Sequence, residues 1–362
     1  MNEKMSLALW QRLSEAGLVE GEMPAAQPVE RSPWYVRLML GIAGWIASLF
    51  LMAAIGITFS GLFDEEVMLL SFGLIGCVSS YLLFRGRSDN DFVTQIGVAI
   101  CMCGQLMVTF ALFEIFNWRE QQIFWFLALL GAVIALVMPN YLIRVQGAFM
   151  AAGSLIAASW DAGFGYTMQG VLLAVSICIA GRYWLGLNSL LRTDQVWSPF
   201  GYGVVFALIL SNTYLMAGHH WWIDWVEPGL LASYSDYNIG LLVTLAVVLG
   251  LVFRLVRLYS VHIGGSERLL ILVALIILLG MIWLIPATAL GWMLLMVGFA
   301  AASRTMVGVG IVTLLGFLSH YYYSLEFTLL YKSVLLVVTG LVLLTGRWFI
   351  GKWLPVSGGS HD

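Results

Sequence analysis

Charged side chains are scarce in this chain, and their scarcity excludes most classes of soluble protein. Only 10% of the 362 residues are Asp, Glu, Lys or Arg, whereas 61% are hydrophobic, and the mean hydropathy is +0.92. Soluble domains carry about 25% charged residues, and a water-soluble fold of this composition would expose large apolar patches. The composition therefore predicts an integral membrane protein whose apolar surface contacts lipid.

Basic clusters and catalytic motifs are lacking as well. The formal net charge is -3, and no run of Lys and Arg is interleaved with aromatic residues, so nucleic-acid binding is excluded. The chain contains no H-E-x-x-H, no G-x-S-x-G and no glycine-rich phosphate loop. We expect a protein without enzymatic activity and without a cofactor.

Cysteine is rare, and its positions argue against disulfides and metal sites. All four cysteines fall in apolar runs rather than in loops: Cys77, Cys101, Cys103 and Cys178. This placement implies no disulfide framework. Cys101 and Cys103 lie about 200° apart around a helix, so their thiols point to opposite sides. In the longest outer loop, His219 and His220 are metal-ligand types, but neighbouring side chains seldom share one ion. We predict no metal.

The N-terminal segment, residues 1–34, does not resemble a secretory signal, because charges interrupt every apolar stretch in it. We therefore expect a cytoplasmic N-terminus. Apolar residues recur here at helical spacing, namely Met5, Leu9, Leu13 and Ala16. The spacing predicts a short amphipathic helix that either lies on the membrane surface or docks a soluble partner.

Long apolar runs follow one another closely from residue 35 to residue 352. A transmembrane helix needs about 20 apolar residues, and twelve runs approach or exceed that length: 36–62, 67–84, 92–116, 122–138, 142–160, 163–183, 199–218, 236–256, 267–285, 287–302, 305–320 and 326–350. The predicted fold is all-α, a polytopic integral membrane helical bundle of about 12 transmembrane helices. Residues 353–362 form a C-terminal tail.

The distribution of basic residues predicts the orientation. Fifteen of the 17 Lys and Arg residues fall at the N-terminus, at the C-terminus or in the alternate loops on the same side. Of the other two, Arg119 lies in an opposite loop and Lys332 lies within a run. Because cytoplasmic loops carry the Lys and Arg, we expect both termini inside and a location in the cell inner membrane.

Ionisable residues within the apolar runs are the first functional candidates, because a charge in lipid is energetically costly. These residues are Glu114, His320, Glu326 and Lys332. Glu326 and Lys332 are six residues apart, about 240° around a helix, so they cannot pair with each other. Two interpretations of Lys332 stand: it snorkels to the outer headgroups, or it meets polar groups of neighbouring helices in a buried site.

The third run has the most polar interior. Gln95 and Gln105 lie about 80° apart around its helix, so both can face one seam of the bundle, and Glu114 follows at the outer end. Hydrogen bonds between amides of neighbouring helices are the ordinary explanation. A substrate pathway is the alternative, and both apply equally to Gln169 and Asn212.

One C-terminal pattern is more specific than these single residues. The pattern Tyr-Tyr-x-Leu-x-x-Thr-Leu-Leu-x-Lys-Ser runs from Tyr322 to Ser333, and Pro33-Trp34-Tyr35 precedes the first run. In these residues the chain resembles an uncharacterised bacterial membrane family, domain of unknown function 4401 (DUF4401). The resemblance implies a membrane-anchored protein of the GDYxxLxY type as a partner. It also makes Tyr322, Leu325, Lys332 and Ser333 the positions to test first.

These observations lead to two functional hypotheses. The leading one is a non-enzymatic membrane subunit that assembles with an envelope partner, because the loops are short and catalytic motifs are missing. The alternative is a transporter or flippase-like protein for a small or lipidic substrate, because the third run and Lys332 place polar groups in the membrane. A large cavity reaching mid-membrane beside Gln105 and Lys332 would favour the alternative, whereas a solid bundle there would remove its main support.

Overall fold

The computed structural model describes residues 66–86, 91–117, 120–183, 194–216, 234–259 and 265–324, with single positions between 14 and 54 and between 330 and 344. In the continuous ranges the chain forms ten helices and no strand: α3 (Glu66–Arg85), α4 (Asp91–Phe116), α5 (Glu120–Val137), α6 (Tyr141–Asp161), α7 (Gly165–Tyr183), α8 (Asp194–Met216), α9 (Tyr234–Tyr259), α10 (Gly265–Leu284), α11 (Thr288–Ala300) and α12 (Arg304–Ser324). Each helix coincides with one predicted apolar run.

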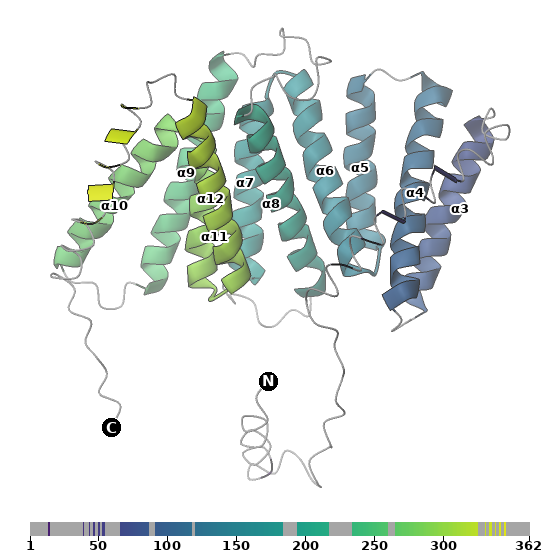
Figure 1. Ribbon diagram of the computed structural model, residues 1–362, viewed down its shortest axis with the longest axis horizontal. Coiled ribbons are helices and arrows are strands. Elements are labelled where there is room, and N and C mark those ends of the chain that lie inside the picture. Colours follow the sequence, from purple (N-terminus) through teal and green to yellow (C-terminus); the bar gives the residue numbers. More distant parts are fainter. Residues whose placement is uncertain are drawn as a thin grey trace.

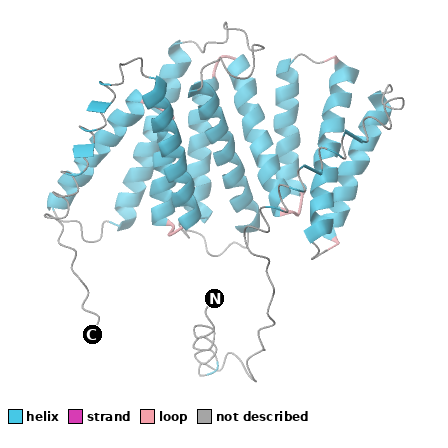
Figure 2. Ribbon diagram, in the orientation of Figure 1, coloured by secondary structure: helices cyan, strands magenta, loops and turns pink. Residues whose placement is uncertain are grey.

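The helices stand side by side and alternate in direction, with α3 at one edge of the array and α10 at the other (Figure 1). The described connections are short and join successive helices at alternating ends (Figure 2). Pro139 and Pro286 each lie in such a connection, where a helix cannot continue through the proline ring without losing a hydrogen bond. After Pro139, Asn140 caps α6, since its side chain accepts from the backbone N–H of Leu142 at 2.9 Å.

Several predicted features lie outside the continuous ranges. They are the amphipathic helix, the runs 36–62 and 326–350, the tail 353–362, the loop with His219 and His220, and the side chains of Glu326 and Lys332. Two boundaries within the described part were wrong by four or more residues, and one of them is the end of α12, at Ser324 rather than at 320. α8 begins at Asp194, five residues before the predicted start at 199, and it accommodates Pro199 in its interior, where that residue is fully buried.

Two groups of buried side chains hold the helices together. The larger core joins α6 to α12, with Leu208, Val248, Met293 and Met306 almost fully buried. A smaller cluster lies between α4, α5 and the start of α6 and includes Cys101 and Ile143. The pair α3–α4 therefore contacts the rest of the described protein through this smaller cluster.

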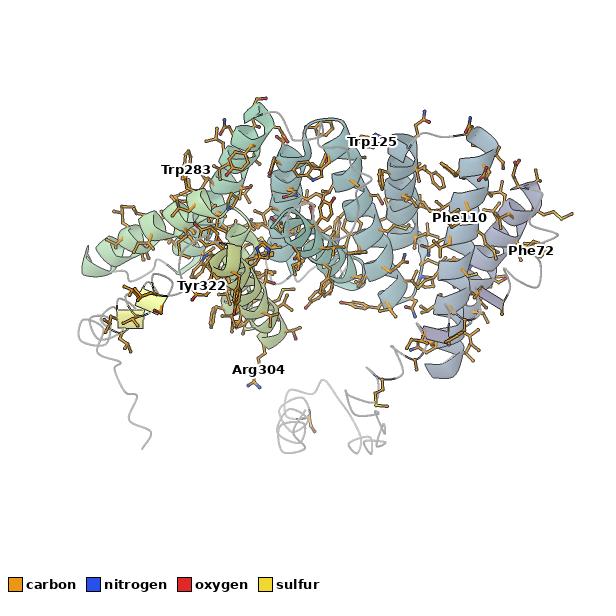
Figure 3. All side chains as sticks on the ribbon, turned by 45° about the horizontal axis from the view of Figure 1, so that its top comes forward. Phe72, Phe110, Trp125, Trp283, Arg304 and Tyr322 are labelled. Carbon is orange, nitrogen blue, oxygen red and sulfur yellow. The ribbon has the colours of Figure 1, made fainter. Side chains whose placement is uncertain are left out.

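The outward faces are apolar along the whole array. Phe72, Phe110, Trp125 and Trp283 project away from the helices, with 42–60% of each side chain exposed (Figure 3). Five described helices, namely α3, α4, α6, α9 and α12, are long and apolar enough to cross a membrane. Apolar helices with apolar outer faces are solvated by lipid rather than by water, so the protein is a membrane protein.

α11 differs from its neighbours in length and burial. Its 13 residues rise about 20 Å, less than the ~30 Å of a hydrocarbon core. Eight of these residues are buried, including Met293, Leu294 and Val297. Because protein rather than lipid surrounds α11, its length does not have to match the bilayer.

The two ends of the array carry different charges. Every arginine in the described helices falls at or near the end where α3, α7 and α9 finish and α6, α10 and α12 begin: Arg85, Arg144, Arg182, Arg254, Arg257, Arg268 and Arg304. We call this the arginine end; Arg304 marks it in Figure 3. Glu66, Glu114, Glu120, Asp161 and Asp236 lie at the opposite end, while Asp91, Asp194 and Glu267 share the arginine end.

Candidate functional site

Gln105, the mid-helix candidate on α4, is paired with a glutamine of another helix. Gln146 Nε2 on α6 donates to Gln105 Oε1 at 3.0 Å, and Gln105 Nε2 lies 3.4 Å from Gln146 Oε1. Gln105 Nε2 also donates to Cys101 Sγ at 3.2 Å. Only 3% of Gln105 is exposed. Gln105 thus makes the interhelical amide hydrogen bonds that are the ordinary explanation for a glutamine within a transmembrane helix.

The other predicted site residues are dispersed. Gln95 is half-buried on α4, and Glu114 is exposed in the last turn of the same helix. Tyr322 is half-buried near the end of α12, with its ring edge-on to that of Tyr323 at 5.5 Å. Ser333 is exposed, and its hydroxyl donates to the backbone carbonyl of Leu330 at 2.8 Å. The described structure therefore does not bring these candidates into one site.

The cysteines offer no alternative centre. All four are free thiols; Cys101 and Cys103 are buried, whereas Cys178 is exposed. Among the residues that the structure describes, no group of three or more His, Cys, Asp or Glu side chains has the arrangement needed to hold a metal ion.

A cavity between four helices is the better candidate. Its volume is about 190 Å³. The lining comes from α7, α8, α9 and the start of α11: Tyr166, Gln169, Leu173, Leu208, Asn212, Tyr237, Gly240, Leu241, Thr244, Pro286, Ala287, Ala289 and Leu290. We call it the four-helix pocket. α7, α9 and α11 begin near it and α8 ends near it, so it lies at the end of the array opposite the arginines.

The amide groups of the pocket are held in fixed orientations. Gln169 Nε2 donates to Ser211 Oγ at 2.7 Å, which joins α7 to α8. Asn212 Nδ2 donates to the backbone carbonyl of Leu208 at 2.8 Å, one turn earlier on its own helix. In both amides one N–H of the NH₂ group has a protein acceptor, so the second N–H and the side-chain carbonyl oxygen are left to meet a molecule in the pocket.

The buried carboxylate of Asp236, on α9, holds the first turn of α7 in place. Asp236 is 4% exposed. Its carboxylate accepts from the backbone N–H of Tyr166 at 2.9 Å and of Thr167 at 3.1 Å, and from the Thr167 hydroxyl at 2.5 Å. A negative charge at a helix N-terminus satisfies N–H groups that have no partner within the helix and interacts favourably with the helix dipole. Asp236 therefore caps α7 from a different helix.

Aromatic rings and a close backbone contact rigidify the same region. The ring of Tyr166 packs edge-on against Trp160 at 4.7 Å and against Tyr237 at 5.1 Å. A Cβ atom on Gly240 would lie 2.5 Å from the carbonyl carbon of Tyr166. Only glycine allows α9 to approach α7 this closely, and the two tyrosines of the lining are held in place as a result.

The walls of the four-helix pocket are mainly apolar, with a few polar side chains. Among the residues that the structure describes, none that lines the pocket is Asp, Glu, Lys, Arg or His, and the carboxylate of nearby Asp236 already accepts hydrogen bonds from the first turn of α7. Moving an ion out of water requires compensating charges or ligands, which this lining does not supply. Apolar walls with a few oriented amides and hydroxyls are typical of sites for small molecules.

Some of these residues escaped the sequence analysis. Gln146 was not considered, although it is the one amide side chain in the run 142–160 and that signal was available. Asp236 was not among the candidate residues either, although it is the first residue of the run 236–256. Its role as a cap depends on the packing of α9 against α7, which no local pattern specifies.

Comparison with known proteins identifies the family but no described relative. No curated protein and no solved structure matches the chain. Residues 33–352 match a family described as Domain of unknown function (DUF4401). This match covers most of the chain and includes every residue of the four-helix pocket. The protein therefore belongs to the DUF4401 family.

Proposed function

We propose that this protein is a non-enzymatic carrier of a small, uncharged polar solute, and that the four-helix pocket binds this solute. The observation that carries the proposal is the lining of the pocket, where Gln169, Asn212 and Thr244 interrupt apolar walls without adding a charge. A volume of about 190 Å³ is below the 300–1,000 Å³ of sites for drug-sized ligands. It suits a solute of a few heavy atoms.

We further propose an orientation in the membrane that puts the four-helix pocket on the outer side. In our proposal the chain crosses the cell inner membrane about twelve times, with both termini in the cytoplasm. The arginines at one end of the described helices support this topology, because cytoplasmic ends of spans carry the basic residues. The four-helix pocket lies at the other end and would receive its solute from the periplasm.

Solute flux into reconstituted vesicles tests the proposal. Purified protein is incorporated into proteoliposomes, and erythritol entry is followed by light scattering after an osmotic step. We expect Thr244→Phe to reduce entry to the rate of protein-free vesicles, because the larger ring fills the pocket. Thr213→Phe is the matched control on the exposed face of α8 and should leave the rate unchanged. Equal rates for the two variants would contradict the proposal.

Assembly with a partner is a second candidate function, and the packing of α10 favours it. Of the side chains described on α10, Ile282 is buried, whereas Leu272, Ile276 and Ile277 are each more than half exposed. Against the helices that the structure describes, little of the surface of α10 is packed, so this helix can accept another helix within the membrane. The partner in this proposal is a membrane-anchored protein of the GDYxxLxY type.

Photo-crosslinking distinguishes a partner from lipid. A photoreactive amino acid replaces Ile276 on α10 or, as the control, Met293, which is fully buried in α11. We expect a crosslinked membrane protein from position 276 and none from position 293. Crosslinks to lipid alone at position 276, together with recovery of an unaccompanied protein from mild detergent, would count against assembly.

A further inference from the structure

Three polar side chains of the four-helix pocket share one level along the helix axes. Gln169 on α7 donates to Ser211 on α8 at 2.7 Å, so Asn212, the next residue on α8, lies at nearly the same depth. A Cβ atom on Gly170 would lie 2.9 Å from Cγ1 of the valine that precedes Thr244 on α9. Three helices therefore each contribute one polar side chain to the same layer of the pocket, namely Gln169, Asn212 and Thr244.

Two leucines lie one helical turn deeper in the membrane. α7 begins near the pocket and α8 ends near it, so residue numbers increase with depth on α7 and decrease with depth on α8. Leu173 follows Gln169 by four residues, and Leu208 precedes Asn212 by four residues. Four residues of an α-helix rise about 6 Å. Both leucines line the pocket below its polar layer.

Leu290 on α11 completes the leucine layer. The Ser176 hydroxyl of α7 donates to Met293 Sδ of α11 at 3.7 Å, so these two residues share a level. Leu173 and Leu290 lie three residues before them on helices that both begin near the pocket, so they share a level as well. All three leucines belong to the larger core and are at most 5% exposed: Leu173, Leu208 and Leu290. The inner end of the pocket is therefore apolar.

We infer that the four-helix pocket binds a small amphiphile, with an uncharged polar group between Gln169, Asn212 and Thr244 and a short hydrocarbon end against the three leucines. The inference rests on the proposed function and narrows its solute class. A hydroxyl group placed against the leucines loses its hydrogen bonds to water and gains none. A hydrocarbon end is instead stabilised by leaving water. Erythritol, with a hydroxyl on every carbon, can enter the pocket but is held less tightly.

Two isomeric diols test the inference by saturation-transfer NMR on the full-length protein in nanodiscs. Butane-1,2-diol carries both hydroxyl groups at one end, whereas butane-1,4-diol carries one at each end, so only the placement of the polar groups differs. Signal that Thr244→Phe removes is counted as binding in the pocket. We expect butane-1,2-diol to bind about ten-fold more tightly. Equal affinities, or tighter binding of butane-1,4-diol, would overturn the inference.

Variants locate the preference in the leucine layer. Leu173→Asn and Leu208→Asn each place an amide where the second hydroxyl of butane-1,4-diol would lie, and each should abolish the ten-fold preference. Leu210→Asn is the matched control on α8, because Leu210 is 58% exposed and does not line the pocket; it should keep the preference. Thermal unfolding verifies that each variant is folded. If one variant fails to fold, the other is decisive, and a folded variant that keeps the full preference would contradict the inference.

The results separate this inference from the proposed function. If Thr244→Phe blocks erythritol entry but the two diols bind equally, the solute site stands and the amphiphile inference is wrong. If Thr244→Phe leaves entry unchanged, the carrier function itself is wrong.

Discussion

At the scale of single residues, the paired amides show how a membrane protein satisfies polar groups without water. Gln105 and Gln146 exchange hydrogen bonds between α4 and α6. The sequence predicted that Gln105 was a residue of interest because it lies in an apolar run. It could not identify the partner, because 41 residues separate the two glutamines and the contact depends on how α4 packs against α6.

The amide pair leads to a prediction of coupled stability. Gln105→Leu should destabilise the protein by about 0.6 kcal/mol, the average for an interhelical hydrogen bond in a membrane, because Gln146 loses its partner. Changing both glutamines to leucine should restore much of that stability, since no polar group is then left unpaired. Reversible unfolding in mixed detergent micelles measures all four states of the cycle. Strictly additive effects would show that the pair does not interact.

Asp236 supports a second prediction at this scale. Asp236→Ala removes three hydrogen bonds from the first turn of α7 and should cost about 1–3 kcal/mol. Asp236→Asn keeps one acceptor and should cost less, because it loses mainly the charge at the helix N-terminus. Hydrogen exchange at the amides of Tyr166 and Thr167 is the direct measurement. Unchanged protection in the alanine variant would contradict the capping role.

At the scale of helices, the apolar runs predicted the elements well but not their contacts. The boundaries of α3, α6 and α9 agree with the predicted runs to within three residues. Which face of each helix packs against protein and which contacts lipid could not be predicted. A helix such as α11 is apolar on every side, so its sequence does not distinguish the two environments. The sequence also failed at α8, where the predicted run begins at residue 199 but the helix begins at Asp194 and continues through Pro199.

Close packing of α5 and α6 gives a prediction that compares two glycines of one helix. A Cβ atom on Gly147 would lie 2.8 Å from the backbone nitrogen of Ala135. A Cβ atom on Gly153 would have no atom of another described element within 4 Å. Gly147→Ala should therefore destabilise the protein by about 1–3 kcal/mol. Gly153→Ala should be neutral or stabilising by up to about 1 kcal/mol, because alanine is the better helix former. Thermal unfolding of both variants checks this. The opposite ranking would mean that α5 and α6 are farther apart.

At the scale of the whole molecule, the charge pattern and the pocket support one arrangement. Arginines gather at one end of the described helices, and the four-helix pocket lies at the other. The sequence predicted the first feature from the loops alone. The pocket could not be predicted, because it forms only where four helices pack together. Three of these helices contribute polar side chains, namely Gln169, Asn212 and Tyr237, and no local sequence pattern specifies that they line one cavity.

Thiol labelling from the periplasmic side tests the central claim, that the four-helix pocket opens to the outer aqueous phase. The four native cysteines are replaced, and one cysteine is introduced as Thr244→Cys or, as the control at similar depth on the exposed face of α9, as Leu242→Cys. The account predicts that a membrane-impermeant thiol reagent labels position 244 in cells with a permeabilised outer membrane, and that position 242 stays unlabelled. Labelling of position 244 only in inverted inner-membrane vesicles, or in neither preparation, would contradict it.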